Sequence, residues 1–153
     1  MLEFLPPRIL DAVRHVNLNS LYELRIRADK PLRANVGGEY CYLGDRGTSV
    51  RAGDALLPTM QEVEDIVFAA SGYCVYSVAE QIKQGFVTGA CGERIGICGS
   101  YVYENGGALS IHAVTSVCIR IPHAVEGCAA AVYERCLQDR MRSLLILSPP
   151  GEG

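Results

Sequence analysis

The chain lacks an excess of basic residues and any long apolar run. Its formal net charge of -3 argues against general affinity for nucleic acid, although a local arginine patch can hide within a mildly acidic total. No apolar run approaches the roughly 20 residues that cross a bilayer. The N-terminus also lacks the basic segment and apolar segment of an export signal. We therefore expect a cytoplasmic chain that is not itself transmembrane.

The usual motifs of metal sites and hydrolases are absent too. The seven cysteines show no C-x-x-C spacing, the three histidines form no i, i+4 pair, and no serine lies in G-x-S-x-G. We therefore predict no metal site and no nucleophilic hydrolase. Several cysteines lie in apolar, strand-like stretches, which favours buried, reduced thiols over metal or redox chemistry: Cys41, Cys91, Cys98 and Cys118.

The first half of the chain mixes helical and strand patterns. Proline at residues 6 and 7 and apolar residues at helical spacing predict a helix over residues 7–16. The period then changes to two, which predicts a half-buried strand from residue 21. Gly37-Gly38 predicts a hairpin between strands at 32–36 and 40–43, and residues 44–55 read as a loop. Thr59 and Glu62 then form the capping-box pattern at the start of a second helix.

The second half is rich in β-pattern. A short helix is expected at residues 78–84, and Asn105-Gly106 is a strong hairpin signal. A final helix is expected over 125–138. The expected strands cover 86–90, 94–103, 108–111 and 114–121. Together these patterns predict an α+β domain over residues 1–140, in which helices pack on an antiparallel sheet.

The C-terminal tail is the sharpest local feature. Residues 144–147 are a short apolar run, which predicts a strand buried on both faces. The glycine- and proline-rich turn that follows matches the first half of the phosphate-binding pattern G-x-x-x-x-G-K-[ST], whose backbone N–H groups hold phosphates. The matching residues are Ser148, Pro149, Pro150, Gly151, Glu152 and Gly153. The alternative is an ordinary strand with a frayed end.

A series of motifs along the chain carries a resemblance to a known family. It includes Glu23-Leu24-Arg25-Ile26-Arg27, Tyr73-x-x-Tyr76-Ser77, the stretches 80–88 and 92–99, and Ser116-Val117-Cys118-Ile119-Arg120-Ile121. With the tail at 148–153, this series resembles the stage III sporulation protein AA family of endospore-forming bacteria. The resemblance covers nearly the whole chain.

The resemblance implies an ATPase similar to those of type II and type IV secretion systems. The implied cofactors are ATP and Mg²⁺, and the implied assembly is a homo-oligomeric, hexameric ring. The implied partners are membrane proteins of a channel between mother cell and forespore, and the implied location is the mother-cell cytoplasm. The implied fold is a secretion-ATPase N-terminal domain followed, at residues 141–153, by the first strand of a P-loop α/β domain. The Walker A lysine and the Walker B acid are not in this sequence, so we expect these residues alone not to hydrolyse ATP and to need no cofactor.

Four arginines have two interpretations. In related secretion ATPases, N-terminal-domain arginines can reach a nucleotide, and guanidinium groups suit phosphate oxygens. By this resemblance Arg94 and Arg120 are candidate nucleotide ligands, with Arg25 and Arg27 less favoured. The alternative is that all four form surface ion pairs with Glu23, Asp29 or Glu93, which contribute little individually.

Two other function classes stay open. One is a non-catalytic module that docks to a partner protein in a membrane complex. The other is a nucleic-acid binder, which needs a clustered basic face that the linear charge pattern does not show.

Overall fold

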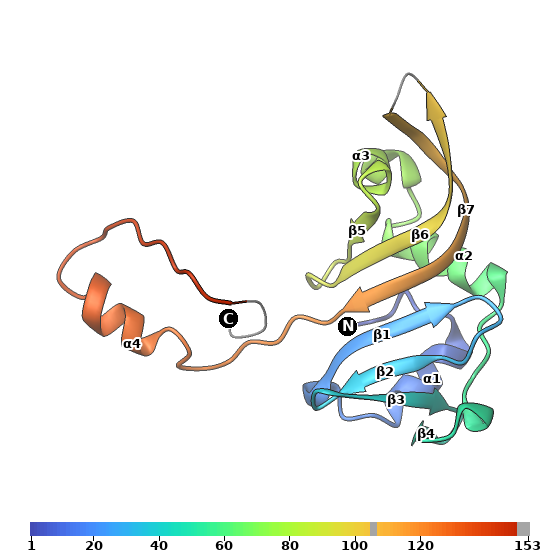
Figure 1. Ribbon diagram of the computed structural model, residues 1–153, viewed down its shortest axis with the longest axis horizontal. Coiled ribbons are helices and arrows are strands. Elements are labelled where there is room, and N and C mark those ends of the chain that lie inside the picture. Colours follow the sequence, from blue (N-terminus) through green and yellow to red (C-terminus); the bar gives the residue numbers. More distant parts are fainter. Residues whose placement is uncertain (105–106, 150–153) are drawn as a thin grey trace. The chain divides into compact units, whose positions relative to one another are not determined.

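The computed structural model describes residues 1–104 and 107–149. The chain forms two compact units, Met1–His123 and Ala124–Gly153, and each is described by itself. The first unit contains one antiparallel sheet, and helices α1 and α2 lie behind it in Figure 1. This α+β architecture with an antiparallel sheet confirms the predicted fold class. The predicted start of a P-loop domain at residue 141 stays a prediction.

The sheet has seven strands in the order β4-β3-β2-β1-β7-β6-β5, and all neighbours are antiparallel. The central strand β1 therefore pairs with a strand from its own hairpin region on one side and with a distant strand on the other. The strands are β1 (Leu21–Arg27), β2 (Arg33–Val36), β3 (Glu39–Gly44), β4 (Gly47–Ser49), β5 (Phe86–Thr88), β6 (Arg94–Glu104) and β7 (Gly107–Arg120).

Two helices cover the apolar face of the sheet. Helix α1 (Pro7–Arg14) has proline at its first position, and helix α2 (Met60–Ala70) has the predicted capping box between Thr59 and Glu62. Glu62 also forms an ion pair with Arg8, at 2.8 Å, which joins the first turn of α2 to α1. The buried residues of both helices join the inward-facing side chains of the strands in one core, among them Ile9, Val13, Val63, Ile66, Leu24, Ile95 and Ile119.

The first predicted hairpin is confirmed, and the loop after it is corrected. Gly37 and Gly38 both have positive φ, as a primed two-residue turn between β2 and β3 requires. Residues 44–55 are not simply a loop, because strand β4 pairs with β3 and a 3-10 turn follows at Ala52–Asp54. A three-residue edge strand carries too few positions to show a period of two, so the sequence pattern missed it.

The second half of the sheet also differs from the predicted pattern. A 3-10 turn at Val75–Val78 leads into helix α3 (Ala79–Lys83). The two strands expected at 108–111 and 114–121 are one strand, β7, because irregularities in the β6–β7 pairing absorb the break in alternation. The Asn105-Gly106 turn lies outside the described residues. Cys91 and Cys98 are exposed, which contradicts the expectation of buried thiols for these two.

The second unit corrects two predictions. The helix expected over 125–138 is reduced to α4 (Ala130–Val132) and a π-helical turn at Tyr133–Leu137. The predicted buried strand at 144–147 is wrong for this structure, because these residues form no regular element and Leu145 and Leu147 are 82% and 83% exposed. A strand needs a neighbouring strand to pair its backbone N–H and C=O groups, and the described part of this unit contains no strand that could serve as one.

An arginine face on the exposed side of the sheet

Five arginines lie on the face of the sheet opposite the core. Because side chains alternate along a strand, Leu24 and Ile26 of β1 face the core while Glu23, Arg25 and Arg27 face outward. The pairing register brings outward residues of β2, β6 and β7 onto the same face. We call this surface the arginine face and define it by Arg25, Arg27, Arg33, Arg94 and Arg120, which are all exposed.

Two pairs of these arginines lie directly opposite each other across strand boundaries. Arg25 of β1 is opposite Arg33 of β2, and Arg94 of β6 is opposite Arg120 of β7. Like charges directly opposite in an antiparallel pair are destabilising by roughly 0.2–1 kcal/mol. The face therefore has a positive charge density that the net charge of the chain conceals.

Glu23 is the acidic centre of this face. Its carboxylate accepts hydrogen bonds from Arg25 Nε, at 2.5 Å, and from the Tyr40 hydroxyl, at 2.9 Å, and it lies 3.7 Å from Arg120 Nε. Tyr40 in turn accepts a hydrogen bond from Arg25 Nη2. Burial raises the pKa of Glu23, but the hydrogen bonds from Arg25 and Tyr40 outweigh it, so the pKa lies below its ordinary value of 4.5.

Aromatic rings hold several of the guanidinium groups in place. The guanidinium carbons of Arg25 and Arg33 lie 4.4 and 5.2 Å from the Tyr40 ring centroid. The guanidinium carbon of Arg94 lies 4.1 Å from the Phe86 ring. Stacking of this kind fixes the plane of a guanidinium while leaving its N–H groups available to an anion. Arg94 has no ion pair with a carboxylate among the described residues.

Two adjoining hollows open between these arginines. One, of about 280 Å³, is lined by Arg94, Arg120 and Phe86, and the other, of about 300 Å³, by Arg25 and Arg27. Both hollows are lined by Gly85, Gly96 and Cys118. Because Gly96 has no side chain, the lining that the two hollows share does not block a ligand. A ligand there can contact guanidinium groups on both sides. Burial, followed by the nearby Glu23 carboxylate, raises the pKa of the Cys118 thiol and keeps it neutral.

Comparison with known proteins places the chain in a family. The model of the family described as "Sporulation stage III, protein AA" matches residues 6–153. The chain belongs to this sporulation family. It is 33% identical over 131 residues to "Stage III sporulation protein AA" of Bacillus subtilis (strain 168), covering 86% of this chain and 39% of that relative. The chain thus spans well under half the length of the relative it matches.

Among solved structures, the chain is similar to the VirB11 ATPase from the Brucella suis type IV secretion system, a crystal structure in complex with sulphate. The identity is 14% and the TM-score 0.43, and the match covers 85% of this chain and 35% of that chain. Within the described residues of this family member, no helix has both the length and the apolarity needed to span a bilayer.

The residues singled out in the sequence fall in two different units. The structure brings Arg25, Arg27, Arg94 and Arg120 onto one face, although they come from three different strands. Ser148 and Pro149 lie in irregular chain of the second unit, and residues 150–153 lie outside the described residues. That Arg94, Arg120 and residues 148–153 bind a nucleotide stays a prediction.

The alternative interpretation, surface ion pairs, holds only in part. Glu23 does interact with Arg25 and Arg120, but within the described residues neither Asp29 nor Glu93 pairs with an arginine. Glu93 is instead 1% exposed. Sequence reasoning also missed Arg33. Alternation along the strand at 32–36 could have identified it, because Arg33 lies on the same side of the hairpin as Tyr40 and Tyr42.

Glu23 gives a prediction about acid stability. Its pKa is lowered in the folded state, so it stabilises the fold above its ordinary pKa, and this contribution is lost as the pH falls through the folded pKa. Glu23→Gln is therefore expected to lower the free energy of unfolding by about 1–2 kcal/mol at neutral pH and low salt, and by far less at an acid pH at which the Glu23 carboxyl is protonated in the folded state too. Urea denaturation at both pH values measures this. Glu80→Gln is the control, because Glu80 forms an exposed pair with Lys83, and an equal loss in both variants would contradict the prediction.

Proposed function

We propose that this chain is the N-terminal portion of a sporulation ATPase in which the arginine face contacts the phosphates of a bound nucleotide. The whole protein would couple ATP binding and hydrolysis to a membrane channel between mother cell and forespore, as a homo-oligomeric ring in the mother-cell cytoplasm. Membership of the stage III sporulation protein AA family supports this role.

The observation that carries the proposal is the opposed pair Arg94 and Arg120. Their guanidinium groups lie over Phe86 and beside Glu23, and both residues line one hollow, so an anion in that hollow would meet positive charge from two strands. A phosphate chain suits this position because each guanidinium can donate two parallel hydrogen bonds to its oxygens. Arg94 lies over Phe86 without a carboxylate partner among the described residues, so an incoming phosphate would not have to displace one.

The phosphate-binding loop is proposed from the sequence. Ser148 to Gly153 match the first half of the Walker A pattern. The exposed apolar residues of the preceding run, Leu144 to Leu147, are unusual at a surface. We propose that they form the predicted strand only beside the further strands of a P-loop domain, which would hold ATP and Mg²⁺.

A nucleotide-binding measurement tests the proposal. We expect a chain extended downstream through the Walker B strand to bind ATP with Mg²⁺. Replacing both Arg94 and Arg120 by glutamine should weaken this binding at least tenfold, because charge-assisted hydrogen bonds to phosphate are lost. Fluorescence titration with a labelled ATP analogue measures the affinity. Arg14→Gln is the matched control, because Arg14 is an exposed arginine of α1 paired with Asp11.

Each other outcome has a definite meaning. No ATP binding by the extended protein would remove the ATPase assignment and favour the non-catalytic docking module. ATP binding that is unchanged by the double substitution would remove the role of the arginine face. Salt-sensitive binding of a single-stranded oligonucleotide to the arginine face, without ATP affinity, would favour the nucleic-acid binder instead.

A further inference from the structure

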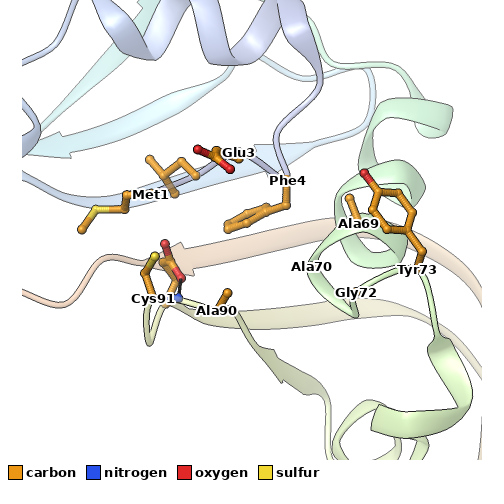
Figure 2. A pocket seen from close by; sticks show the side chains of 11 residues that line it. Met1, Glu3, Phe4, Ala69, Ala70, Gly72, Tyr73, Ala90 and Cys91 are labelled. Carbon is orange, nitrogen blue, oxygen red and sulfur yellow. Dashed lines mark hydrogen bonds between the residues drawn. The ribbon is translucent and has the colours of Figure 1, made fainter.

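A cavity on another part of the first unit contains a buried acid. It measures about 330 Å³ and lies between the N-terminal segment, the end of α2 and the turn between β5 and β6. In Figure 2, Glu3 and Phe4 lie on the N-terminal segment, Cys91 lies on the turn facing them, and Tyr73 follows the end of α2. Glu93, directly before β6, lines the same cavity.

Glu93 has too few hydrogen-bond partners for a buried carboxylate. The residue is 1% exposed, and its Oε2 accepts one hydrogen bond, from the Cys91 backbone N–H at 3.0 Å. Its Oε1 is buried and has no hydrogen-bond partner among the described residues. Removing a carboxylate from water is costly unless a cation or several donors compensate it. A cationic ligand in the cavity would supply what this oxygen lacks.

The other walls of the cavity indicate the kind of cation. Glu3 adds a second carboxylate to the lining, but no group of three His, Cys, Asp or Glu side chains suited to a metal ion is found among the described residues. The remaining lining is largely apolar, with Leu2, Ala69 and Ala70, and includes the ring of Phe4. An apolar wall beside an acid suits a long side chain with an aliphatic stem and a charged end.

Tyr73 supports a binding role for this cavity. It has φ of 61°, a left-handed conformation that is uncommon outside glycine, and it is 71% exposed. Its ring contacts the ring of Phe68 edge to face, with centroids 5.4 Å apart. Backbone strain that holds an exposed aromatic ring at the mouth of a cavity is typical of binding sites.

We propose that this cavity is a docking site for an arginine side chain of a partner protein, with Glu93 as its buried acceptor. The arginine fork donates to Glu93 Oε1, its stem packs on Phe4 and the alanines, and Glu3 attracts it at the rim. The site is separate from the arginine face and does not depend on nucleotide binding. Complementary charge gives the contact its specificity, since a neutral side chain of the same shape would leave the charge of Glu93 uncompensated.

A peptide titration tests this site directly in the present chain. The probe is acetyl-Gly-Gly-Arg-Gly-Gly-amide, and its control carries citrulline, a neutral isostere of arginine. We expect the arginine peptide to shift the backbone NMR signals of Cys91, Glu93 and Tyr73 saturably, and the citrulline peptide to bind at least tenfold more weakly. Glu93→Gln should remove this discrimination, whereas Glu80→Gln, an exposed acid elsewhere in the unit, should keep it.

A second variant tests the proposal if Glu93→Gln does not fold. Ala90→Leu leaves the carboxylate intact but fills part of the cavity, and it should weaken the arginine peptide at least fivefold. Equal binding of the two peptides, or full binding by Glu93→Gln, would overturn the proposal. Agmatine that binds tenfold more tightly than the peptide would also overturn it, because the site would then be one for a small guanidine. Head-to-tail self-association abolished by Glu93→Gln would identify the partner as a second copy of the chain.

Discussion

Gly99→Ala is expected to destabilise the first unit by about 3 kcal/mol or more. Gly99 lies where the pairing of β6 and β7 becomes irregular. A Cβ at this position would overlap the backbone carbonyl oxygen of Ala113 and lie 2.8 Å from its carbon. Backbone atoms of a paired strand cannot move aside as a side chain can, so the two strands would have to separate. Urea denaturation followed by circular dichroism measures the loss.

Gly53→Ala provides the control for this prediction. A Cβ at Gly53 would meet no heavy atom within 4 Å, and the residue is outside the left-handed region. The substitution should therefore change the free energy of unfolding by no more than about 0.5 kcal/mol. If Gly99→Ala changed the free energy of unfolding as little as Gly53→Ala, the result would contradict the close approach of the β6 and β7 backbones at Gly99.

Ile119→Ala is the second change with a large expected effect. Ile119 is 0% exposed, and its register places it between Leu24 of β1 and Ile95 of β6 on the core face. Truncation to alanine leaves a cavity in the middle of the sheet, and we expect a loss of about 2–5 kcal/mol. Because Arg120 is the next residue on the same strand, we also expect any anion affinity of the arginine face to fall.

The smaller truncation Ile119→Val separates packing from other effects. It removes one methylene group and should cost about 0.5–1.5 kcal/mol. The two variants, measured by urea denaturation under the same conditions, should therefore differ clearly. A cost below about 1 kcal/mol for the alanine variant would contradict the buried central position of β7.

The arginine face shows how an acidic chain can present a basic surface. Glu23 is the only acid in contact with it among the described ion pairs, and it shares its carboxylate between Arg25 and Arg120. The net charge of -3 is carried by acids elsewhere. An argument from net charge against anionic partners therefore does not apply to this face. Its charge density is a property of one side of the sheet.

Local sequence signals determined the elements that depend on near neighbours. The capping box at Thr59 and Glu62, the primed turn at Gly37-Gly38 and the alternation in β1 each involve residues within a few positions of one another. Their physics is complete within a short segment, so the pattern alone predicts them. The strand predicted at Leu144 to Leu147 is the converse case, because a strand depends on a neighbour that can come from any part of a chain.

The sites depend on pairings that no local pattern contains. Arg33 and Arg25 are close only because β2 pairs with β1, and Arg94 meets Arg120 only because β6 pairs with β7. Glu93, which the sequence suggested as a surface partner, is buried because its turn packs near the N-terminal segment and α2. The sequence by itself determined helices α1 and α2, the Gly37-Gly38 turn and the family that the chain resembles. The tertiary structure decided which charges gather on one face and which acid lacks a partner, because burial and long-range register arise only when distant segments pack together.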